Sequence, residues 1–150
     1  MMNDQDTLFR KKAILVDIMG TWCHNCMDAA PLLQKLSSEF SDQGLQVIAL
    51  SFELSEDPLK ARRNLLLYEE RYGITFPVLF CGSTAAANID AKVKSQINNF
   101  PGYPTTLFVG RNGVVRMIHG GFNGPATGDL YQTQINKYYD LVKSLLKEKK

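Results

Sequence analysis

Two cysteines separated by two residues carry the clearest chemistry in this sequence. Cys23 and Cys26 directly follow the apolar run 13–19 and precede a stretch with helical periodicity. Two thiols on the first turn of a helix can close a small disulfide ring, and the unpaired N–H groups there stabilise Cys23 as a thiolate. Because the thiolate is the species that attacks a disulfide, this arrangement predicts thiol-disulfide exchange.

A Cys-x-x-Cys pair can also supply two ligands of a zinc site. The other two would have to come from Cys81, His24 and His119, which are not grouped as a second zinc knuckle. A purely structural disulfide is another alternative, but a ring that joins residues three apart removes little entropy from the unfolded chain. Redox chemistry is therefore favoured, and since the cysteine pair is its own electron carrier, we expect no metal and no organic cofactor.

Composition sets limits on the class of protein. The chain has 150 residues, of which 45% are hydrophobic and 21% charged, which suits one domain with a substantial core. Its formal net charge is +2, with basic residues dispersed except at the C-terminal tail, so nothing supports nucleic-acid binding. No apolar stretch approaches the roughly 18–20 residues of a membrane span, and residues 1–7 are polar, unlike the core of a signal peptide.

The hydrophobic pattern predicts an α/β domain with a central mixed sheet and helices on both faces. Strands are expected at 13–19, 45–52, 76–80, 105–109 and 114–119, and helices at 26–40, 58–72, 89–97 and 130–146. The Asn-Gly turn at 112–113 joins the last two strands as an antiparallel hairpin, whereas the earlier strands are expected to be parallel. In the helix 58–72, Leu59, Leu65, Leu66 and Tyr68 are expected to face inward.

These features resemble the TlpA/ResA-like thiol-disulfide oxidoreductases, which are bacterial proteins of thioredoxin-like fold. The motifs that match, in the order of the family, are Trp22-Cys23-x-x-Cys26, Pro31, Tyr103-Pro104-Thr105-Thr106, the turn 112–113 and the stretch 121–128. The resemblance extends from about residue 8 to the end. It implies a single thioredoxin-like domain over 1–150, in which the segment 58–97 includes the helix and strand that this branch inserts into the smaller thioredoxin fold.

The resemblance also implies roles for the residues of the cysteine motif. Cys23 corresponds to the exposed nucleophile and Cys26 to the resolving thiol, which agrees with their places relative to the helix start. Attack by Cys23 would give a mixed disulfide with the partner, and Cys26 would then resolve it. Trp22 resembles the family tryptophan that shields the sulfurs and packs on the partner, and an ordinary core tryptophan is the alternative.

Pro104 matches the cis-proline of the family, which lies against the cysteine pair and leaves the adjacent backbone free to pair with a bound peptide. Tyr103 and Thr105 flank this proline, and we expect them to belong to the substrate-binding surface. A strand-forming role is the alternative for Thr105.

Asp17 interrupts the apolar run 13–19, six residues before Cys23. Thioredoxins carry a buried aspartate at this position, which assists proton transfer from the resolving cysteine. Burial would raise the pKa of Asp17 and let it act as a general base toward Cys26. Alternatively, the side chain reaches an edge or a water molecule. ResA-type relatives instead place a glutamate three residues after the second cysteine, where this chain has Ala29.

Three further residues could modulate the site. A protonated His24 beside Cys23 would favour the reduced state and make the pair more oxidising, whereas an exposed neutral His24 would have little effect. Cys81 follows the third strand and is expected to be a small buried hydrophobe, with a regulatory disulfide as the alternative. His119 is treated as structural.

The predicted function is a thiol-disulfide oxidoreductase acting on proteins, and a reductase rather than an oxidant. Its partners would be proteins with disulfides, which in relatives can include apocytochromes c, and a membrane or soluble thiol reductant that resets the pair. A peptide-binding module without turnover is one alternative. A thiol peroxidase is another, but the Pro-x-x-x-Thr-x-x-Cys setting that it needs does not precede Cys23.

Composition and resemblance differ on the compartment. No signal sequence is visible, so the chain as written would be cytoplasmic. The family is usually exported, so we expect a fragment of a longer exported precursor, periplasmic or membrane-tethered and facing the periplasm.

Overall fold

The computed structural model describes residues 11–149 and is built on a five-stranded sheet with the strand order β3-β2-β1-β4-β5. The strands are β1 (Ala13–Met19), β2 (Leu45–Glu53), β3 (Val78–Ser83), β4 (Thr105–Val109) and β5 (Val115–Gly120). β1, β2 and β3 are parallel, whereas β4 pairs antiparallel with β1 and β5 pairs antiparallel with β4. The sheet is therefore mixed, as the hydrophobic pattern predicts.

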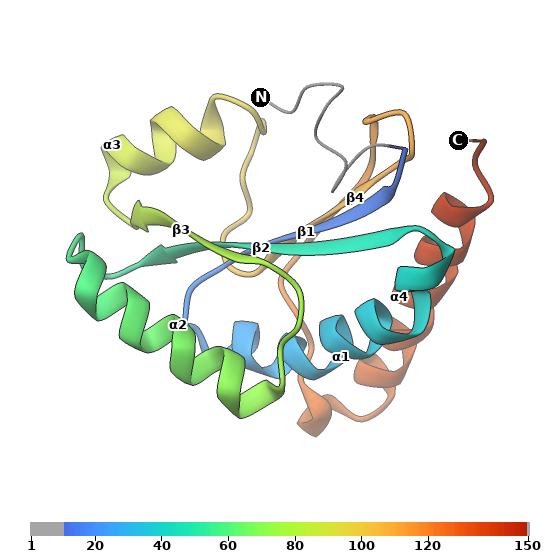
Figure 1. Ribbon diagram of the computed structural model, residues 1–150, viewed down its shortest axis with the longest axis horizontal. Coiled ribbons are helices and arrows are strands. Elements are labelled where there is room, and N and C mark those ends of the chain that lie inside the picture. The colour runs from blue at the N-terminus through green and yellow to red at the C-terminus, as the bar shows by residue number, and fades with distance from the viewer. Residues whose placement is uncertain (1–10, 150) are drawn as a thin grey trace.

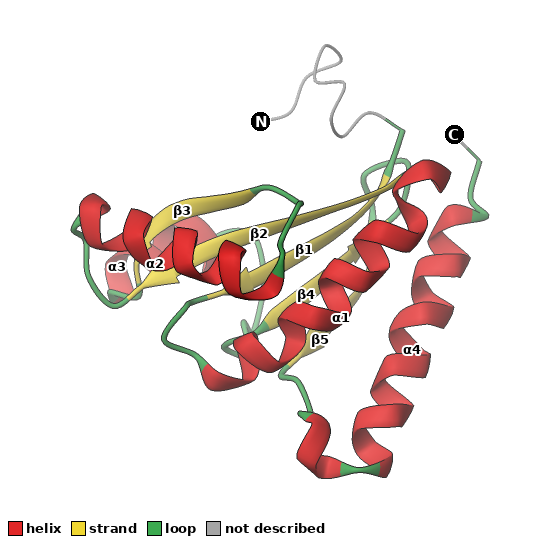
Figure 2. Cartoon of the chain, turned by 60° about the horizontal axis from the view of Figure 1, so that its bottom comes forward, coloured by secondary structure: helices red, strands yellow, loops and turns green. Residues whose placement is uncertain are grey.

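Helices lie on both faces of this sheet, but unequally. They are α1 (His24–Phe40), α2 (Pro58–Tyr72), α3 (Ala86–Ile89) and α4 (Asp129–Leu146), with 3₁₀ turns at Ser41–Gln43 and Pro125–Thr127 and a π-helical turn at Asp90–Lys94. α1, α2 and α4 lie on one side of the sheet and α3 on the other (Figure 1). Figure 2 looks from the side of the three long helices and shows the strands behind them. No helix within residues 11–149 combines the length and apolar character that crossing a bilayer requires.

The main core fills the space between the sheet and the long helices. Leu15 and Met19 of β1, Phe108 of β4, Leu33 of α1 and Tyr138 of α4 are fully buried there. Successive side chains of a strand point to opposite faces, so the continuous apolar run of β1 supplies both this core and the second one beneath α3. Both cysteines of the motif belong to the main core, which places the reactive end of α1 directly on the sheet.

The inward face of α2 differs from the prediction. Ala61, Leu65 and Tyr68 are buried at the spacing of three and four residues that one helix face requires. Leu59 and Leu66 were expected on the same face, but they are exposed and lie on the other side of the helix. The prediction was wrong for these two leucines because the apolar residues of α2 form two stripes, of which the sheet covers one.

The segment between β2 and β4 also departs from the prediction in its details. The third strand begins at Val78 rather than at residue 76, and Pro77, which lacks an N–H group, accepts a bond from the Ala49 amide at its edge. Cys81 consequently lies within β3 and is half-buried, not fully buried as predicted. The helix expected at 89–97 is instead α3 followed by a single π-helical turn.

Candidate active site

The two thiols lie at the start of α1, just beyond the carboxyl end of β1. Cys23 is the N-cap of the helix, and its Sγ accepts a hydrogen bond from the Cys26 amide at 3.3 Å. Both side chains are buried and no disulfide joins them, so the structure shows the dithiol form. Cys23 lies at the helix N-terminus, as expected of a reactive first cysteine, but it is only 8% exposed and not the exposed thiol that the family resemblance implies.

The Cys26 thiol is strongly biased toward its protonated form. Burial raises the pKa of Cys26 well above the ordinary value for a thiol, and its hydrogen bond with Cys23 raises this pKa further. A negative charge on the nearby Asp17 acts in the same direction, while a backbone bond from Gly20 opposes it. Cys26 therefore needs a proton acceptor before it can act as a nucleophile.

Asp17 occupies the core face of β1 between Leu15 and Met19. It is fully buried and does not reach an edge of the sheet, and neither carboxyl oxygen has a hydrogen-bond partner within residues 11–149. Burial raises the pKa of this carboxyl from 3.8 to about 7. The neighbouring Thr106 of β4 does not compensate, because its hydroxyl is bonded to the Tyr138 hydroxyl at 3.1 Å. Asp17 is thus a neutral or weakly acidic group in the same core as Cys26.

The indole ring of Trp22 is partly exposed at the surface of the site. Its side chain is 41% exposed, and its indole Nε1–H donates to the Phe52 carbonyl at 2.8 Å. The indole meets the Tyr103 ring edge-on, with the ring centroids 5.1 Å apart. A Cβ on Gly20 would lie 2.1 Å from Nε1 and 2.6 Å from the Phe52 oxygen, so glycine is needed there. These contacts differ from those of an ordinary core tryptophan.

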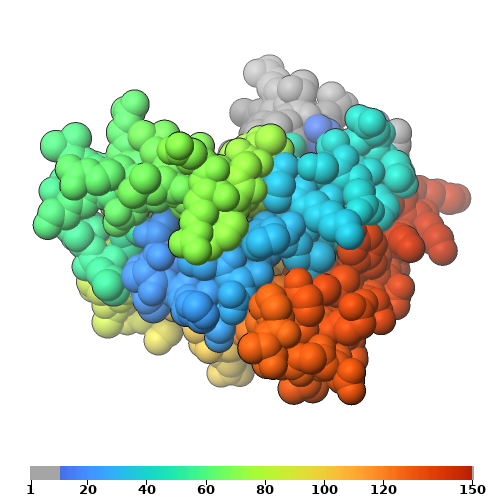
Figure 3. Space-filling model, turned by 90° about the horizontal axis from the view of Figure 1, so that it is seen from below, coloured from blue at the N-terminus to red at the C-terminus, as the bar shows by residue number. Residues whose placement is uncertain are grey.

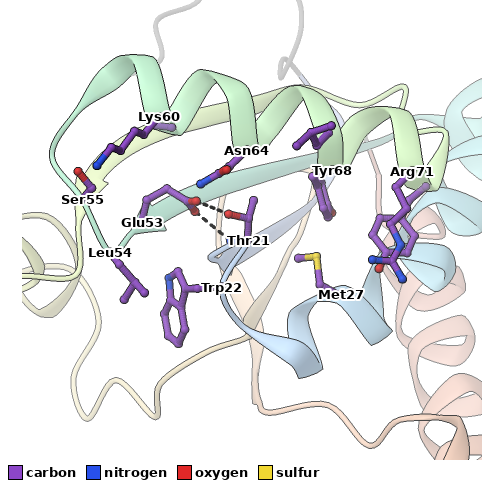
Figure 4. Close-up of a pocket in the computed structure, with 13 residues that line it drawn as sticks. Thr21, Trp22, Met27, Glu53, Leu54, Ser55, Lys60, Asn64, Tyr68 and Arg71 are labelled. Atoms are coloured by element: carbon purple, nitrogen blue, oxygen red, sulfur yellow. Dashed lines mark hydrogen bonds between the residues drawn. The ribbon is translucent and has the colours of Figure 1, made fainter.

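Glu53 anchors the loop before Cys23, and the sequence reasoning did not identify it. This carboxylate is 3% exposed and accepts hydrogen bonds from the Thr21 amide at 2.9 Å and from the Thr21 hydroxyl (Figure 4). It also accepts one from the Ser51 hydroxyl at 2.6 Å. The sequence could have indicated this role, because Glu53 is an acidic residue at the end of a long apolar strand. Functional groups of parallel sheets gather at the carboxyl ends of the strands.

The Tyr103–Pro104 peptide bond is cis, as expected from the family resemblance. Pro104 is buried, and its carbonyl accepts a bond from the Gly121 amide at 2.7 Å. The side chain of Thr105 is fully buried on the sheet face opposite to Cys26, and its hydroxyl donates to the Gly102 carbonyl at 2.5 Å. For Thr105 the structure therefore favours the strand-forming alternative over a side chain on the substrate-binding surface.

A third loop, at residues 121–124, closes the site on the side of α4. The amide side chain of Gln134 clamps the backbone of Asn123, donating to its carbonyl at 3.0 Å and accepting from its N–H at 2.9 Å. Gly124 packs against Asp28 of α1, since a Cβ there would lie 2.4 Å from a carboxylate oxygen. In the space-filling view, the blue start of α1 lies between the green segment of α2 and the orange segment after β5 (Figure 3).

The remaining candidates lie at the margin of the site. The His24 side chain is largely exposed, and its Nε2 lies 3.7 Å from a carboxylate oxygen of Asp28. His119 is held between Gln134 and Lys137 on the far side of loop 121–124, with ring nitrogens 3.3 and 3.4 Å from them. Within residues 11–149, no three His, Cys, Asp or Glu side chains are grouped as a metal site.

Comparisons with known proteins identify relatives of this chain. The model of the AhpC/TSA family matches residues 3–118. The thioredoxin-like protein YneN of Bacillus subtilis is 32% identical over 110 residues, which cover 73% of this chain and 57% of that protein. The thiol-disulfide oxidoreductase ResA of Geobacillus kaustophilus is 25% identical over 135 residues, which cover 90% of this chain and 66% of that protein. The chain thus spans about two thirds or less of the length of these two relatives.

A solved structure shows the same fold. The crystal structure of a thiol-disulfide isomerase from Corynebacterium glutamicum superposes with a TM-score of 0.70 at 19% sequence identity, covering 99% of this chain and 90% of that one. The expected thioredoxin-like fold is therefore confirmed.

Proposed function

Because this chain belongs to the AhpC/TSA family and is a TlpA/ResA-like thioredoxin-fold protein, we propose that it is an enzyme, a thiol-disulfide oxidoreductase acting on protein disulfides. The observation that carries the proposal is the placement of Cys23 as the N-cap of α1, bonded to the Cys26 amide and adjacent to the Trp22–Tyr103 aromatic pair. The thiol pair is its own electron carrier, so the reaction requires no metal or organic cofactor.

The proposed reaction proceeds in two exchanges. The Cys23 thiolate attacks one sulfur of a client disulfide, which breaks the S–S bond, releases the other client sulfur as a thiolate and leaves a mixed disulfide. Cys26 then transfers its proton to the Asp17 carboxylate and attacks the Cys23 sulfur, expelling the second client thiolate. Solvent and Asp17, which took up the protons of Cys23 and Cys26, protonate the two client thiolates. The client thus gains two electrons and two protons, and Cys23 and Cys26 end as a disulfide. Asp17 is assigned the acceptor role because it is fully buried, its charge acts on the Cys26 thiol, and its pKa is about 7.

We assign client binding to the surface around Trp22, Tyr103 and Pro104. Trp22 presents a partly exposed aromatic face beside Cys23, and Tyr103 packs edge-on against it. Thr105 contributes through the strand that holds Pro104, since its own side chain is buried. The redox direction we propose is reducing, with a membrane or soluble thiol reductant that restores the dithiol. The family resemblance supports a location facing the periplasm.

Reduction of insulin, with dithiothreitol as the recycling reductant, tests this function. Cys23→Ser is expected to abolish catalysed reduction, and Cys26→Ser is expected to accumulate mixed disulfides that mass spectrometry detects. Cys81→Ser is the matched control, because Cys81 lies in β3 away from the pair, and it should retain activity. Retained turnover in Cys23→Ser would refute the mechanism. Faster consumption of hydrogen peroxide than of insulin disulfides would indicate a thiol peroxidase instead.

A further inference from the structure

A cleft opens beside the cysteine motif, between α2 and the loop that carries Trp22 (Figure 4). Its volume is about 380 Å³, which lies within the range of ligand-binding clefts. Thr21 and Trp22 line it from the loop before α1, and Met27 lines it from α1 itself. Glu53 at the end of β2 and Leu67 and Arg71 of α2 line it as well. Apart from Trp22, none of these residues belongs to the client-binding surface around Tyr103 and Pro104.

The position of the cleft relative to Cys23 is set by Trp22. One side of the indole contacts Tyr103, next to Pro104, and the indole also lines the cleft. Met27, one helical turn after Cys23, lines the cleft from below. Trp22, the sequence neighbour of Cys23, therefore contacts both Tyr103, which precedes the cis-proline, and this cleft.

The cleft combines an apolar lining with exposed apolar side chains at its mouth. Leu54 and Leu67 flank it and are 70% and 58% exposed, and Trp22 is 41% exposed. Exposed apolar groups that line one cleft are characteristic of interaction sites, whereas single exposed leucines are ordinary. An occupant with an apolar side chain would bury these groups.

Two basic side chains lie at opposite ends of the cleft without an ion-pair partner among residues 11–149. Lys60 and Arg71 are eleven residues apart on α2, which corresponds to about 16 Å along the helix axis, and Figure 4 shows them at opposite ends. Neither makes a hydrogen bond or ion pair to any residue within 11–149, although the Arg71 guanidinium lies over the Tyr72 ring at 5.2 Å.

The acids near the cleft are already engaged. Glu53 accepts three hydrogen bonds and is almost fully buried. Of the two acids that precede α2, Asp57 accepts from the Leu59 amide, and Glu56 accepts from the hydroxyl and amide of Ser83. These carboxylates keep their negative charge, but none of them forms an ion pair with Lys60 or Arg71, so both cations can pair with a carboxylate from outside the chain.

We propose that this cleft is a specificity subsite for the client polypeptide, which takes an apolar side chain with an acidic neighbour from the segment beside the target cysteine. The apolar side chain packs against Trp22 and Leu67, and the carboxylate pairs with Arg71 or Lys60. The proposal rests on the proposed function and adds to it a preference among clients.

Matched peptide substrates test the preference. Each substrate is a symmetrical disulfide of a short peptide with self-quenching fluorophores, in which Leu-Glu, Leu-Gln or Leu-Lys flanks the cysteine on both sides. The unmodified protein is expected to show a KM for the Leu-Glu peptide about fivefold lower than for the Leu-Gln peptide, with a similar kcat, because each partly exposed ion pair contributes modestly. The Leu-Lys peptide should have the highest KM.

Variants locate the effect. Replacing both Lys60 and Arg71 by Gln should remove the preference for Leu-Glu, and Leu67→Ser should raise KM for all three peptides. The matched control replaces Lys35 and Lys143, two exposed cations of α1 and α4 outside the cleft, by Gln, and it should keep the preference.

Two outcomes would overturn the subsite. Equal KM values for the Leu-Glu and Leu-Gln peptides would show that the cleft does not distinguish a charged from a neutral side chain. Loss of the preference for Leu-Glu in the Lys35 and Lys143 control would show that the preference comes from the overall charge of the protein. If the unmodified protein reduced none of the peptides and no insulin, the proposed function itself would fail.

Discussion

A buried carboxyl group without a hydrogen-bond partner costs free energy when it ionises, and Asp17 is such a group. Both its oxygens are unpartnered within residues 11–149, and burial raises its pKa from 3.8 to about 7. Between these two values the folded chain keeps a proton that the unfolded chain has lost, so stability falls as pH rises through this window. Above pH 7 the full cost is present, about 4 kcal/mol at 1.36 kcal/mol per pKa unit.

Asp17→Asn should therefore stabilise the reduced protein, and more so at pH 8 than at pH 4. The expected difference in its effect between the two pH values approaches 4 kcal/mol. Urea unfolding at both pH values measures it, with the exposed Asp42→Asn as the control that should show little change. A gain in stability that is the same at both pH values would contradict the raised pKa of Asp17.

The same variant separates the stability role of Asp17 from its proposed chemistry. Without the carboxylate, transfer of the Cys26 proton must rely on solvent, which burial restricts. Resolution of a preformed mixed disulfide on Cys23 should therefore be slower in Asp17→Asn near neutral pH, as measured by quenched alkylation. An unchanged pH-rate profile would remove Asp17 from the mechanism.

At the scale of elements, the end of β2 fixes the geometry of the β1–α1 loop. Glu53 holds Thr21 and Ser51, and the adjacent Phe52 carbonyl holds the indole of Trp22. The bonds to Thr21 and Trp22 join residues that are 32 and 30 positions apart in the sequence. They keep Trp22 at the surface beside Cys23. The position of the indole therefore depends on β2, which contains neither cysteine of the motif.

Glu53→Ala should loosen this loop, because the Thr21 amide and two hydroxyls lose their acceptor in a buried position. We expect a loss of about 3 kcal/mol in the free energy of unfolding. Trp22 is the single tryptophan of the chain, so its emission reports on the loop, and it should shift to longer wavelength as the indole becomes more exposed. The exposed Glu70→Ala is the control. An unchanged emission spectrum would show that the Phe52 carbonyl holds Trp22 without Glu53.

Sequence patterns predicted the elements that are apolar throughout or carry a motif. β1, β2, the β4–β5 hairpin and α4 agree with the expected ranges to within one or two residues, because burial on both faces or helical periodicity leaves a clear pattern. The cysteine pair and the cis-proline were identified by motif. The ranges predicted for β3 and α3 differ from the observed ones, because the short apolar runs of this segment do not distinguish a strand from a helix.

Glu53 and Gln134 escaped the sequence reasoning for a different reason. Each acts through hydrogen bonds to backbone or hydroxyl groups that the fold, not the local sequence, brings near. Gln134 clamps loop 121–124 from α4, eleven residues away, and has no periodic or motif signature. Residues that position a site through such contacts can be identified only once the arrangement of the strands and helices is known.

For the molecule as a whole, the redox direction depends on how well the fold stabilises the reduced pair as a thiolate. A strongly stabilised thiolate makes a dithiol protein an oxidant, whereas weak stabilisation makes it a reductant. Here Cys23 accepts one hydrogen bond, from Cys26, and its basic neighbour His24 is paired with Asp28 at the surface. Cys26 is buried next to an acid that opposes its ionisation. The surroundings of the pair thus favour a reducing protein.

We therefore expect the Cys23–Cys26 couple to have a reduction potential near or below that of thioredoxin, about −270 mV, and far from the value of about −120 mV for the oxidant DsbA. Equilibration in dithiothreitol or glutathione buffers, followed by alkylation and mass spectrometry, measures it. Asp28→Asn releases His24 from its surface partner and should move the potential toward the oxidising side, while the exposed Asp140→Asn should not. A potential near that of DsbA would reverse the proposed direction, and the client would then receive a disulfide instead of losing one.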